Sequence, residues 1–165
     1  MPVEITLSMW EIMQAAFVGA MRQVSALSLN RKSRYGEEGE NDWQIHIEGA
    51  LGEFAVAKYL GIFWNGTLGS IHLPDVGTYQ VRTRSKHHYD LLVHDEDKDN
   101  DIFILVTGKN GNYVIRGWMV AKQAKNRDKY WKNVGNDRPA YFVPQSDINP
   151  IETLPKINKA IGEIK

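Results

Sequence analysis

Hydrophobic positions near the N-terminus recur with the spacing of an α-helix. Each lies three or four residues from another, so they share one side of a helix: Met13, Phe17, Ala20, Met21 and Val24. Ser8 and Glu11 have the spacing of a capping box, and Leu7 and Ile12 flank it as a hydrophobic staple. These signals predict a helix that begins just after Ser8.

A second helix is predicted over residues 42–60. Asn41 or Asp42 would cap its N-terminus, and Gly61 would end it. One side of this helix carries an apolar stripe made of Trp43, Ile47, Ala50, Phe54 and Ala57. The polar, glycine-containing segment 31–42 before it is typical of a mobile, solvated connection.

The rest of the chain is rich in short β-type runs separated by turn signals. The predicted strands cover residues 70–73, 79–84, 89–93, 102–106, 113–119 and 141–143. Gly108-Lys109-Asn110-Gly111 predicts a hairpin turn. A basic helix is predicted over 121–130, and a further short helix from Pro155.

Helices followed by a strand meander and another helix indicate an α+β fold with a mixed sheet. The length of 165 residues fits one domain. We divide it into an N-terminal helix and mobile loop (1–40), a core (41–145) and a C-terminal tail (146–165).

Composition excludes several classes of protein. Twenty Lys and Arg balance twenty Asp and Glu, which argues against a uniformly cationic nucleic-acid wrapper while leaving room for a local basic patch. The chain has no cysteine, so disulfides, thiolate nucleophiles and cysteine-ligated zinc are impossible. The apolar run 15–21 is too short for a membrane span and lacks the basic residues of a signal peptide. We therefore expect a soluble cytoplasmic protein with no membrane partner.

Polar residues with potential chemistry gather around the predicted strand 79–84. Because side chains alternate along a strand, Gln80, Arg82 and Arg84 share one face. Asp75, in the turn before the strand, could converge on the same patch. The alternative is a hairpin whose polar face is simply solvated.

Glu53 in the second helix lies at the border of the buried stripe. Burying its carboxylate is costly unless a cation meets it. Gly49, one turn earlier, leaves room above Glu53 for an ion or a phosphate. Alternatively, Gly49 and Gly52 serve close helix packing, and Glu53 forms an ordinary salt bridge with Arg82.

The order of these residues resembles the PD-(D/E)XK nuclease superfamily. The matching segments are Gly49-x-x-Gly52-Glu53, Pro74-Asp75 before a hairpin, Gln80-Val81-Arg82 in the (D/E)-x-K position, and Gly117-Trp118 before a helix. The resemblance covers roughly residues 48–125 and is nearest to small, phage-type or mobile-element members. It implies a restriction-endonuclease-like core, α/β/α-like, with a central mixed sheet flanked by helices.

The resemblance also implies Mg²⁺- or Mn²⁺-assisted hydrolysis of DNA phosphodiester bonds. Glu53, Asp75 and Gln80 would be metal ligands together with the carbonyl of Val81, and Arg82 would be the cation beside the scissile phosphate. Two positions depart from the family pattern. Gln80 replaces an acid and removes one negative charge, and Arg82 replaces a lysine and essentially never gives up a proton. If that lysine acts only as an electrostatic stabiliser, Arg82 can replace it; if it acts as a base, activity is lost.

A nucleic-acid surface would have to be local. The candidate residues lie at or just after the end of the strand 79–84 or in the basic helix: Arg84, Lys86, Lys122, Lys125 and Arg127. A solvated helix face is the alternative for the basic run. The alternating acids at Asp95, Asp97, Asp99 and Asp101 lack the glycine and glutamate of an EF-hand loop, which indicates an acidic turn.

Three functions therefore remain open. The first is a metal-dependent DNA endonuclease, and the second is a nuclease-fold DNA-binding module that has lost hydrolysis. The third is a protein-interaction domain in which Glu53 is only part of an ion pair. By analogy with nucleases of this size, a homodimer is also expected.

Overall fold

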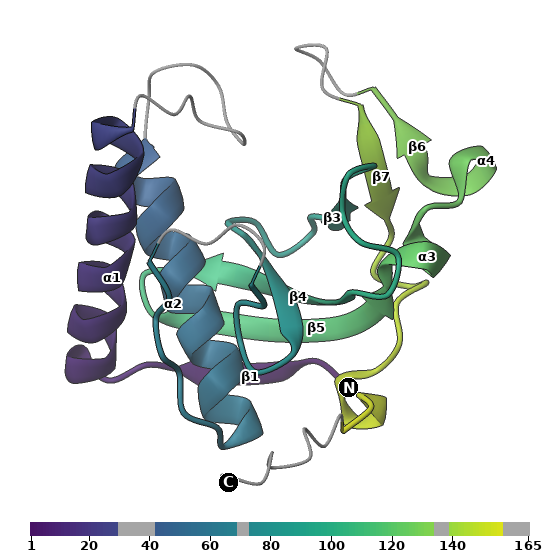
Figure 1. The fold of residues 1–165 in the computed structure, drawn as a ribbon. Helices are drawn as coiled ribbons and strands as arrows, with labels where there is room; N and C mark the ends of the chain where they lie inside the picture. Colours follow the sequence, from purple (N-terminus) through teal and green to yellow (C-terminus); the bar gives the residue numbers. More distant parts are fainter. Residues whose placement is uncertain (30–41, 69–72, 134–138, 157–165) are drawn as a thin grey trace, which may run out of the picture.

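The computed structural model describes residues 1–29, 42–68, 73–133 and 139–156. Its main sheet has the strand order β1-β5-β4-β2, formed by β1 (Val3–Thr6), β2 (Tyr79–Arg84), β4 (Ile102–Lys109) and β5 (Asn112–Val120). β2 runs parallel to β4, and the other pairs are antiparallel. The sheet is therefore mixed, as the sequence predicted (Figure 1).

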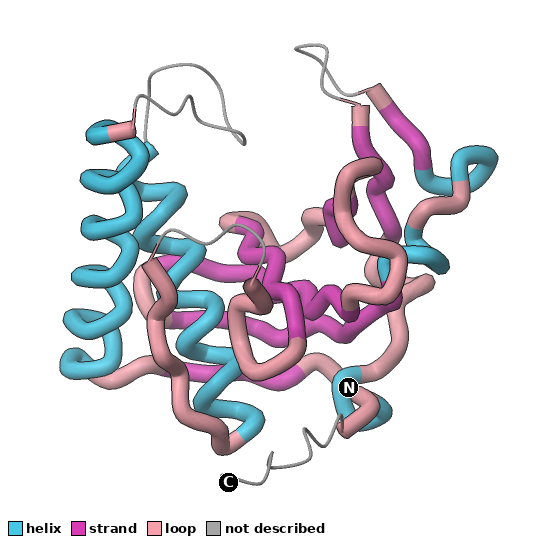
Figure 2. The backbone as a smooth tube through the Cα atoms, in the orientation of Figure 1, coloured by secondary structure: helices cyan, strands magenta, loops and turns pink. Residues whose placement is uncertain are grey.

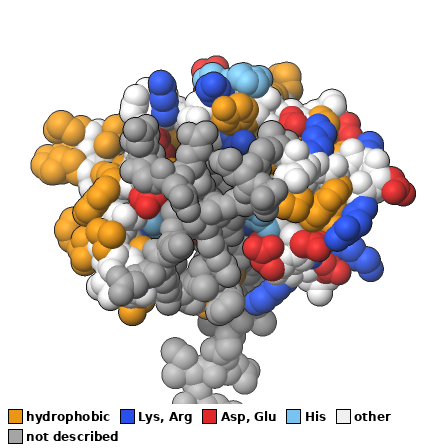
Figure 3. Space-filling model, turned by 90° about the horizontal axis from the view of Figure 1, so that it is seen from above, with side chains coloured by type: hydrophobic (Ala, Val, Ile, Leu, Met, Phe, Trp, Pro, Cys, Tyr) orange, Lys and Arg blue, Asp and Glu red, His pale blue; other side chains and the backbone are white. Residues whose placement is uncertain are grey.

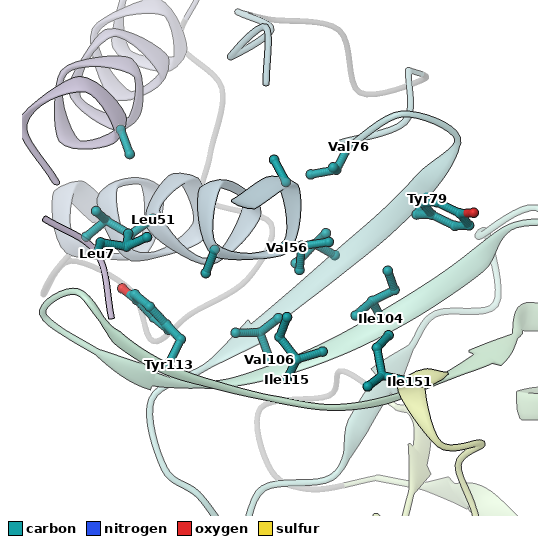
Figure 4. Packing of buried hydrophobic residues seen from close by; sticks show 14 of the residues in the cluster. Leu7, Leu51, Val56, Val76, Tyr79, Ile104, Val106, Tyr113, Ile115 and Ile151 are labelled. Carbon is teal, nitrogen blue, oxygen red and sulfur yellow. The ribbon is translucent and has the colours of Figure 1, made fainter. Parts of the chain in front are cut away.

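Two long helices cover one face of this sheet. α2 (Asp42–Leu60) packs on the strands, and α1 (Met9–Ser28) packs on the outer side of α2 (Figure 1). The first core lies between α2 and the sheet (Figure 4). Its members include Leu51, Val56, Ile104, Val106 and Ile115.

A second, smaller sheet lies against the opposite face. It has the order β3-β7-β6, with β3 (Leu91–Val93), β7 (Ala140–Val143) and β6 (Trp131–Lys132). Two short helices, α3 (Ala121–Ala124) and α4 (Arg127–Tyr130), accompany it, and the 3₁₀ turn η1 (Ile151–Thr153) follows. Figure 2 separates the helical layer from the two groups of strands.

β4 is the strand that both cores share. Ile104 and Val106 face α2, whereas Phe103 and Leu105 face the second sheet. Seven consecutive residues from Ile102 to Gly108 are buried. This explains why β4 reads as a continuous apolar run rather than an alternating one.

Local signals set several boundaries as predicted. The Ser8–Glu11 capping box is formed, and α2 spans Asp42–Leu60 with Gly61 at a positive φ of 64° just after it. The β4–β5 turn places Asn110 and Gly111 at φ 56° and 86°, the conformation that a tight hairpin needs.

Other predictions are wrong or only partly right. The basic helix 121–130 is divided into α3 and α4, because the Asn126 side chain accepts a hydrogen bond from the Lys129 N–H and begins a new helix. The short strands β1 and β6 were not predicted. Residues 31–41, 70–72 and 157–165, on which three of the predicted segments fall, lie outside the described residues.

In the described part of the chain, none of the helices is both long and apolar enough to cross a bilayer.

Candidate functional site

Glu53 is buried in α2 and binds three donors. The Arg22 guanidinium, from α1, donates to both carboxylate oxygens, with Nη1–Oε1 at 2.6 Å and Nη2–Oε2 at 2.9 Å. The Trp64 indole N–H donates to Oε2 at 3.1 Å. Arg22 also donates from Nε to the Thr67 carbonyl at 3.0 Å. Glu53 therefore pairs with Arg22, and the alternative salt bridge with Arg82 is wrong.

Asp75 lies beside this pair, in the turn before β2. Its Oδ2 accepts a hydrogen bond of 2.8 Å from the Val81 backbone N–H. Burial, together with the negative charge of Glu53, raises the pKa of Asp75 to about 7. Arg82 and Arg22 lower this pKa, but their effect is smaller. The site therefore holds two neighbouring carboxyl groups whose negative charges are not fully balanced.

Asp75 is positioned by the free edge of the main sheet. β2 is the terminal strand, and its outer edge is bonded to the preceding turn: Asp75 N and Val76 N both donate to the Tyr79 carbonyl. Within a strand, the N–H and C=O of one residue project to the same side. The Val81 carbonyl is therefore directed toward the same edge as the Val81 N–H that binds Asp75.

Gln80 and Arg82 lie on the other face of β2 from α2. Val81 belongs to the core under α2, and Thr83 packs against Gly52 of that helix. Gln80 is half-buried. It directly follows Tyr79, whose carbonyl accepts the hydrogen bonds from the turn that contains Asp75. The alternation of Gln80, Arg82 and Arg84 with core residues agrees with the sequence pattern.

Arg82 is held by three groups of the protein itself. Its Nη2 donates to both oxygens of Asp97 at 3.0 Å, and its Nε donates to the Leu92 carbonyl at 3.2 Å. The guanidinium also stacks on Phe103, 4.5 Å from the ring centroid. It still acts electrostatically on Asp75, whose pKa it lowers.

Sequence reasoning missed Arg22 and Trp64. Arg22 is one of only two charged residues in α1, the other being Glu11. An arginine isolated in an otherwise uncharged helix was the signal that could have indicated a buried partner.

A further arginine was missed because a β-bulge places it. The β4–β5 register shifts between Leu105 and Val106, which leaves Arg116 without a partner residue on β4. Arg116 Nε donates to Thr107 Oγ1 at 2.7 Å, and its Nη2 lies 3.0 Å from His87 Nδ1. No carboxylate in the described part of the chain forms a salt bridge with Arg116.

The predicted nucleic-acid residues fall into two groups. Arg84 ends β2, and Lys86 follows it. Both side chains lie over the Tyr89 ring, and burial lowers the pKa of Arg84. Lys122 is exposed on α3. Arg127 stacks on Trp131 and pairs with Asp95 at 3.2 Å.

Lys125 has a different environment from the other basic residues. Its ammonium donates to the carbonyls of Asp95 and Asp97 and to Asp99 Oδ1 at 2.8 Å. The acidic turn that follows β3 is thus organised around a lysine of the same chain. Because 15% of this side chain is exposed, Lys125 is poorly placed to meet a phosphate.

The residues around Asp75 offer the hard oxygen donors that magnesium prefers. Magnesium usually needs only one or two carboxylates and keeps several waters. Glu53 and Asp75 supply two, and Asp75 Oδ1 has no hydrogen bond to another described residue. The described residues contain no group of three or more His, Asp or Glu side chains arranged to hold a metal. The set therefore fits a partly hydrated ion better than a closed cage.

Neither a protein-family model, nor a curated protein, nor a solved structure matches this chain.

Proposed function

We propose that this protein is a metal-dependent endonuclease that hydrolyses phosphodiester bonds in DNA. One observation carries the proposal: the buried carboxyl of Asp75 lies close enough to Glu53 for the charge of Glu53 to raise its pKa. Two like charges held together in a buried place are unfavourable for folding alone, and such pairs are characteristic of functional sites.

Glu53 and Asp75 would hold the metal together with the Val81 carbonyl at the edge of β2. The Gln80 amide oxygen would have to reach the ion around that edge, because Gln80 lies on the face of β2 away from α2. When bound, Mg²⁺ or Mn²⁺ would polarise a phosphoryl oxygen and lower the pKa of a bound water. The Gln80 side chain supplies a neutral oxygen where an acid is usual, so affinity for the ion should be lower than for a site with three carboxylates.

The protein's own residues prepare this site before any ligand arrives. Arg22 and Trp64 fix the orientation of Glu53, and the Val81 N–H fixes that of Asp75. Arg84 and Arg116, neither of which forms a salt bridge within the described residues, both lie next to Thr107 and are the cations best suited to a neighbouring phosphate of the DNA. Their guanidinium groups favour bidentate phosphate contacts.

A second candidate function rests on the environment of Arg82. Because Asp97, the Leu92 carbonyl and Phe103 already engage its guanidinium, Arg82 is less available to a scissile phosphate. This observation favours a DNA-binding module that has kept the fold and lost hydrolysis.

The two functions can be separated with supercoiled plasmid and the purified full chain. Nicking that requires Mg²⁺ or Mn²⁺ and is lost in Asp75→Asn supports the endonuclease. The matched control is Asp128→Asn, which removes an exposed acid and should leave nicking unchanged. Salt-sensitive DNA binding without nicking supports the second function. If the protein neither cleaves nor binds duplex, single-stranded or branched DNA at low salt, both proposals are wrong.

A further inference from the structure

The outward side of α1 is a continuous hydrophobic surface. Seven of its large apolar side chains are exposed: Met9, Trp10, Met13, Phe17, Met21, Val24 and Leu27. At 100° per residue they occupy an arc of about 120° along the whole helix. We call these seven residues the α1 face. In Figure 3, hydrophobic side chains gather at the left of the molecule, over α1.

The α1 face is not the side of the helix that packs on α2. The buried residues of α1 are Ala15, Gly19 and Gln23, and the small size of the first two lets the two helices approach closely. A Cβ on Gly19 would lie 2.5 Å from the Ile47 Cα. The apolar periodicity seen in the sequence therefore describes a surface that is still uncovered within the described chain.

The exposed area is large for a monomer. Phe17 and Trp10 are 68% and 67% exposed, and the other five are 36–66% exposed. Since a large side chain shows on the order of 200 Å² when fully exposed, the α1 face presents about 800 Å². The largest apolar patch on a typical monomer is about 300–600 Å². One partner in a standard protein–protein interface buries about 800 Å².

The charge pattern distinguishes a protein partner from a membrane. Helices that lie in a membrane surface carry Lys and Arg along the borders of their apolar face. α1 has a single cation, Arg22, and it is turned inward to Glu53. Its other charge, Glu11, pairs with Lys58. The α1 face contains no charge that would select an oppositely charged partner.

We propose that the α1 face is a homodimer interface, in which two copies of this chain pair α1 against α1 about a two-fold axis. An uncharged apolar face is complementary to itself, as a two-fold interface requires. The face extends evenly on both sides of Phe17, so antiparallel pairing would bury it in both copies at once. Three of its members are methionines, whose flexible side chains fill irregular gaps. The predicted dimer joins two sheets through four helices, with one candidate site in each copy.

The first test is the mass in solution. Sedimentation velocity of the full chain should give twice the chain mass of 18.8 kDa at tens of micromolar. Phe17→Glu should shift the species to a monomer, because a carboxylate would be buried at the centre of the interface. The matched control is Phe63→Glu, the same substitution at a residue that is 90% exposed and outside the α1 face. It should leave the mass unchanged, and circular dichroism should show all three proteins folded.

A second test uses the absence of cysteine. Phe17→Cys, at the centre of the α1 face, introduces the only thiol and places it beside its own copy across the two-fold axis, so mild oxidation should give a disulfide-linked dimer. Phe63→Cys should not. A wild-type monomer at 100 μM, a dimer that persists in Phe17→Glu, or a dimer lost on removing residues 157–165 would each overturn the proposal. The last result would assign the contact to the tail instead of α1.

Discussion

The guanidinium of Arg22 binds both carboxylate oxygens of Glu53, although the two residues are 31 positions apart in the chain. Only 16% of the Arg22 side chain and 7% of the Glu53 side chain are exposed. Glu53 thereby has a cationic partner inside the protein, beside a second carboxyl group, that of Asp75. Arg22 thus links the packing of α1 on α2 to the electrostatics of the candidate site.

Removing Arg22 should destabilise the protein strongly. Arg22→Met keeps the aliphatic stem but leaves the buried Glu53 unpaired, and we expect a loss of about 3–5 kcal/mol in the free energy of unfolding. Urea denaturation followed by circular dichroism measures it. Lys129→Met is the control, since it breaks an ion pair that is 58% exposed on the lysine side. A loss below about 1 kcal/mol for Arg22→Met would contradict the structure.

Asp75 should make stability depend on pH in an unusual direction. Its pKa is about 7 in the folded protein, against 3.8 for an unperturbed aspartate side chain. Between these values the folded state retains a proton that the unfolded state releases, so this group's contribution falls as the pH rises from about 4 to 7.

Asp75→Asn isolates this contribution. The variant should be more stable than the wild type at both pH 5 and pH 8, and its advantage should be larger at pH 8 by at least about 1 kcal/mol. Urea titrations in EDTA at the two pH values make the comparison. If the variant and the wild type differed in free energy of unfolding by the same amount at both pH values, Asp75 would not titrate between them.

The two glycines before Glu53 should respond oppositely to alanine. A Cβ on Gly52 would lie 2.0 Å from Thr83 Oγ1, so Gly52→Ala should cost about 1–3 kcal/mol. A Cβ on Gly49 meets nothing within 4 Å, so Gly49→Ala should stabilise α2 by about 0.5–1 kcal/mol. Thermal or urea unfolding of both variants provides the measurement. Thr83→Ala should restore part of the stability lost in Gly52→Ala. If Gly49→Ala and Gly52→Ala changed the stability equally, the close contact between Gly52 and Thr83 would be wrong.

Lys125 should matter to folding more than to DNA binding. Lys125→Ala removes the ammonium that bonds two carbonyls and a carboxylate of the acidic turn, at a cost of about 2 kcal/mol. Lys122→Ala, three residues earlier and exposed, should change the free energy of unfolding by less than about 0.5 kcal/mol. Lys122→Ala should weaken DNA binding by the folded protein. Lys125→Ala should reduce DNA binding only as far as it reduces the fraction of folded protein. This pair of results would separate a role in DNA binding from a role in folding.

Much of the fold was predictable because its signals are local. The end of α2 follows from Gly61, and the β4–β5 hairpin follows from its Asn-Gly turn. β1 was not predictable, because four residues form a strand there only by pairing with β5, more than 100 positions away. Periodicity indicated which residues of α1 share a side but not which side packs, and Ala15 and Gly19 decided that.

The candidate site was predictable only in part for the same reason. Glu53 and Asp75 could be identified from their place in a helix and before a strand. Their electrostatic coupling, the partner Arg22 and the pairing of Arg82 with Asp97 depend on contacts between distant segments. Arg116 could not be identified from the sequence, because a β-bulge places it and no local sequence signal predicts that bulge.

Since β4 belongs to both cores, neither half of the molecule has a hydrophobic interior that is independent of the other half. Heat or urea should therefore abolish the helical side and the small-sheet side in a single transition. Trp64 packs against the first core and Trp131 against the second, so fluorescence of two single-tryptophan proteins would report one common midpoint. A substitution on either side of this strand then weakens the entire chain and not merely its own neighbourhood.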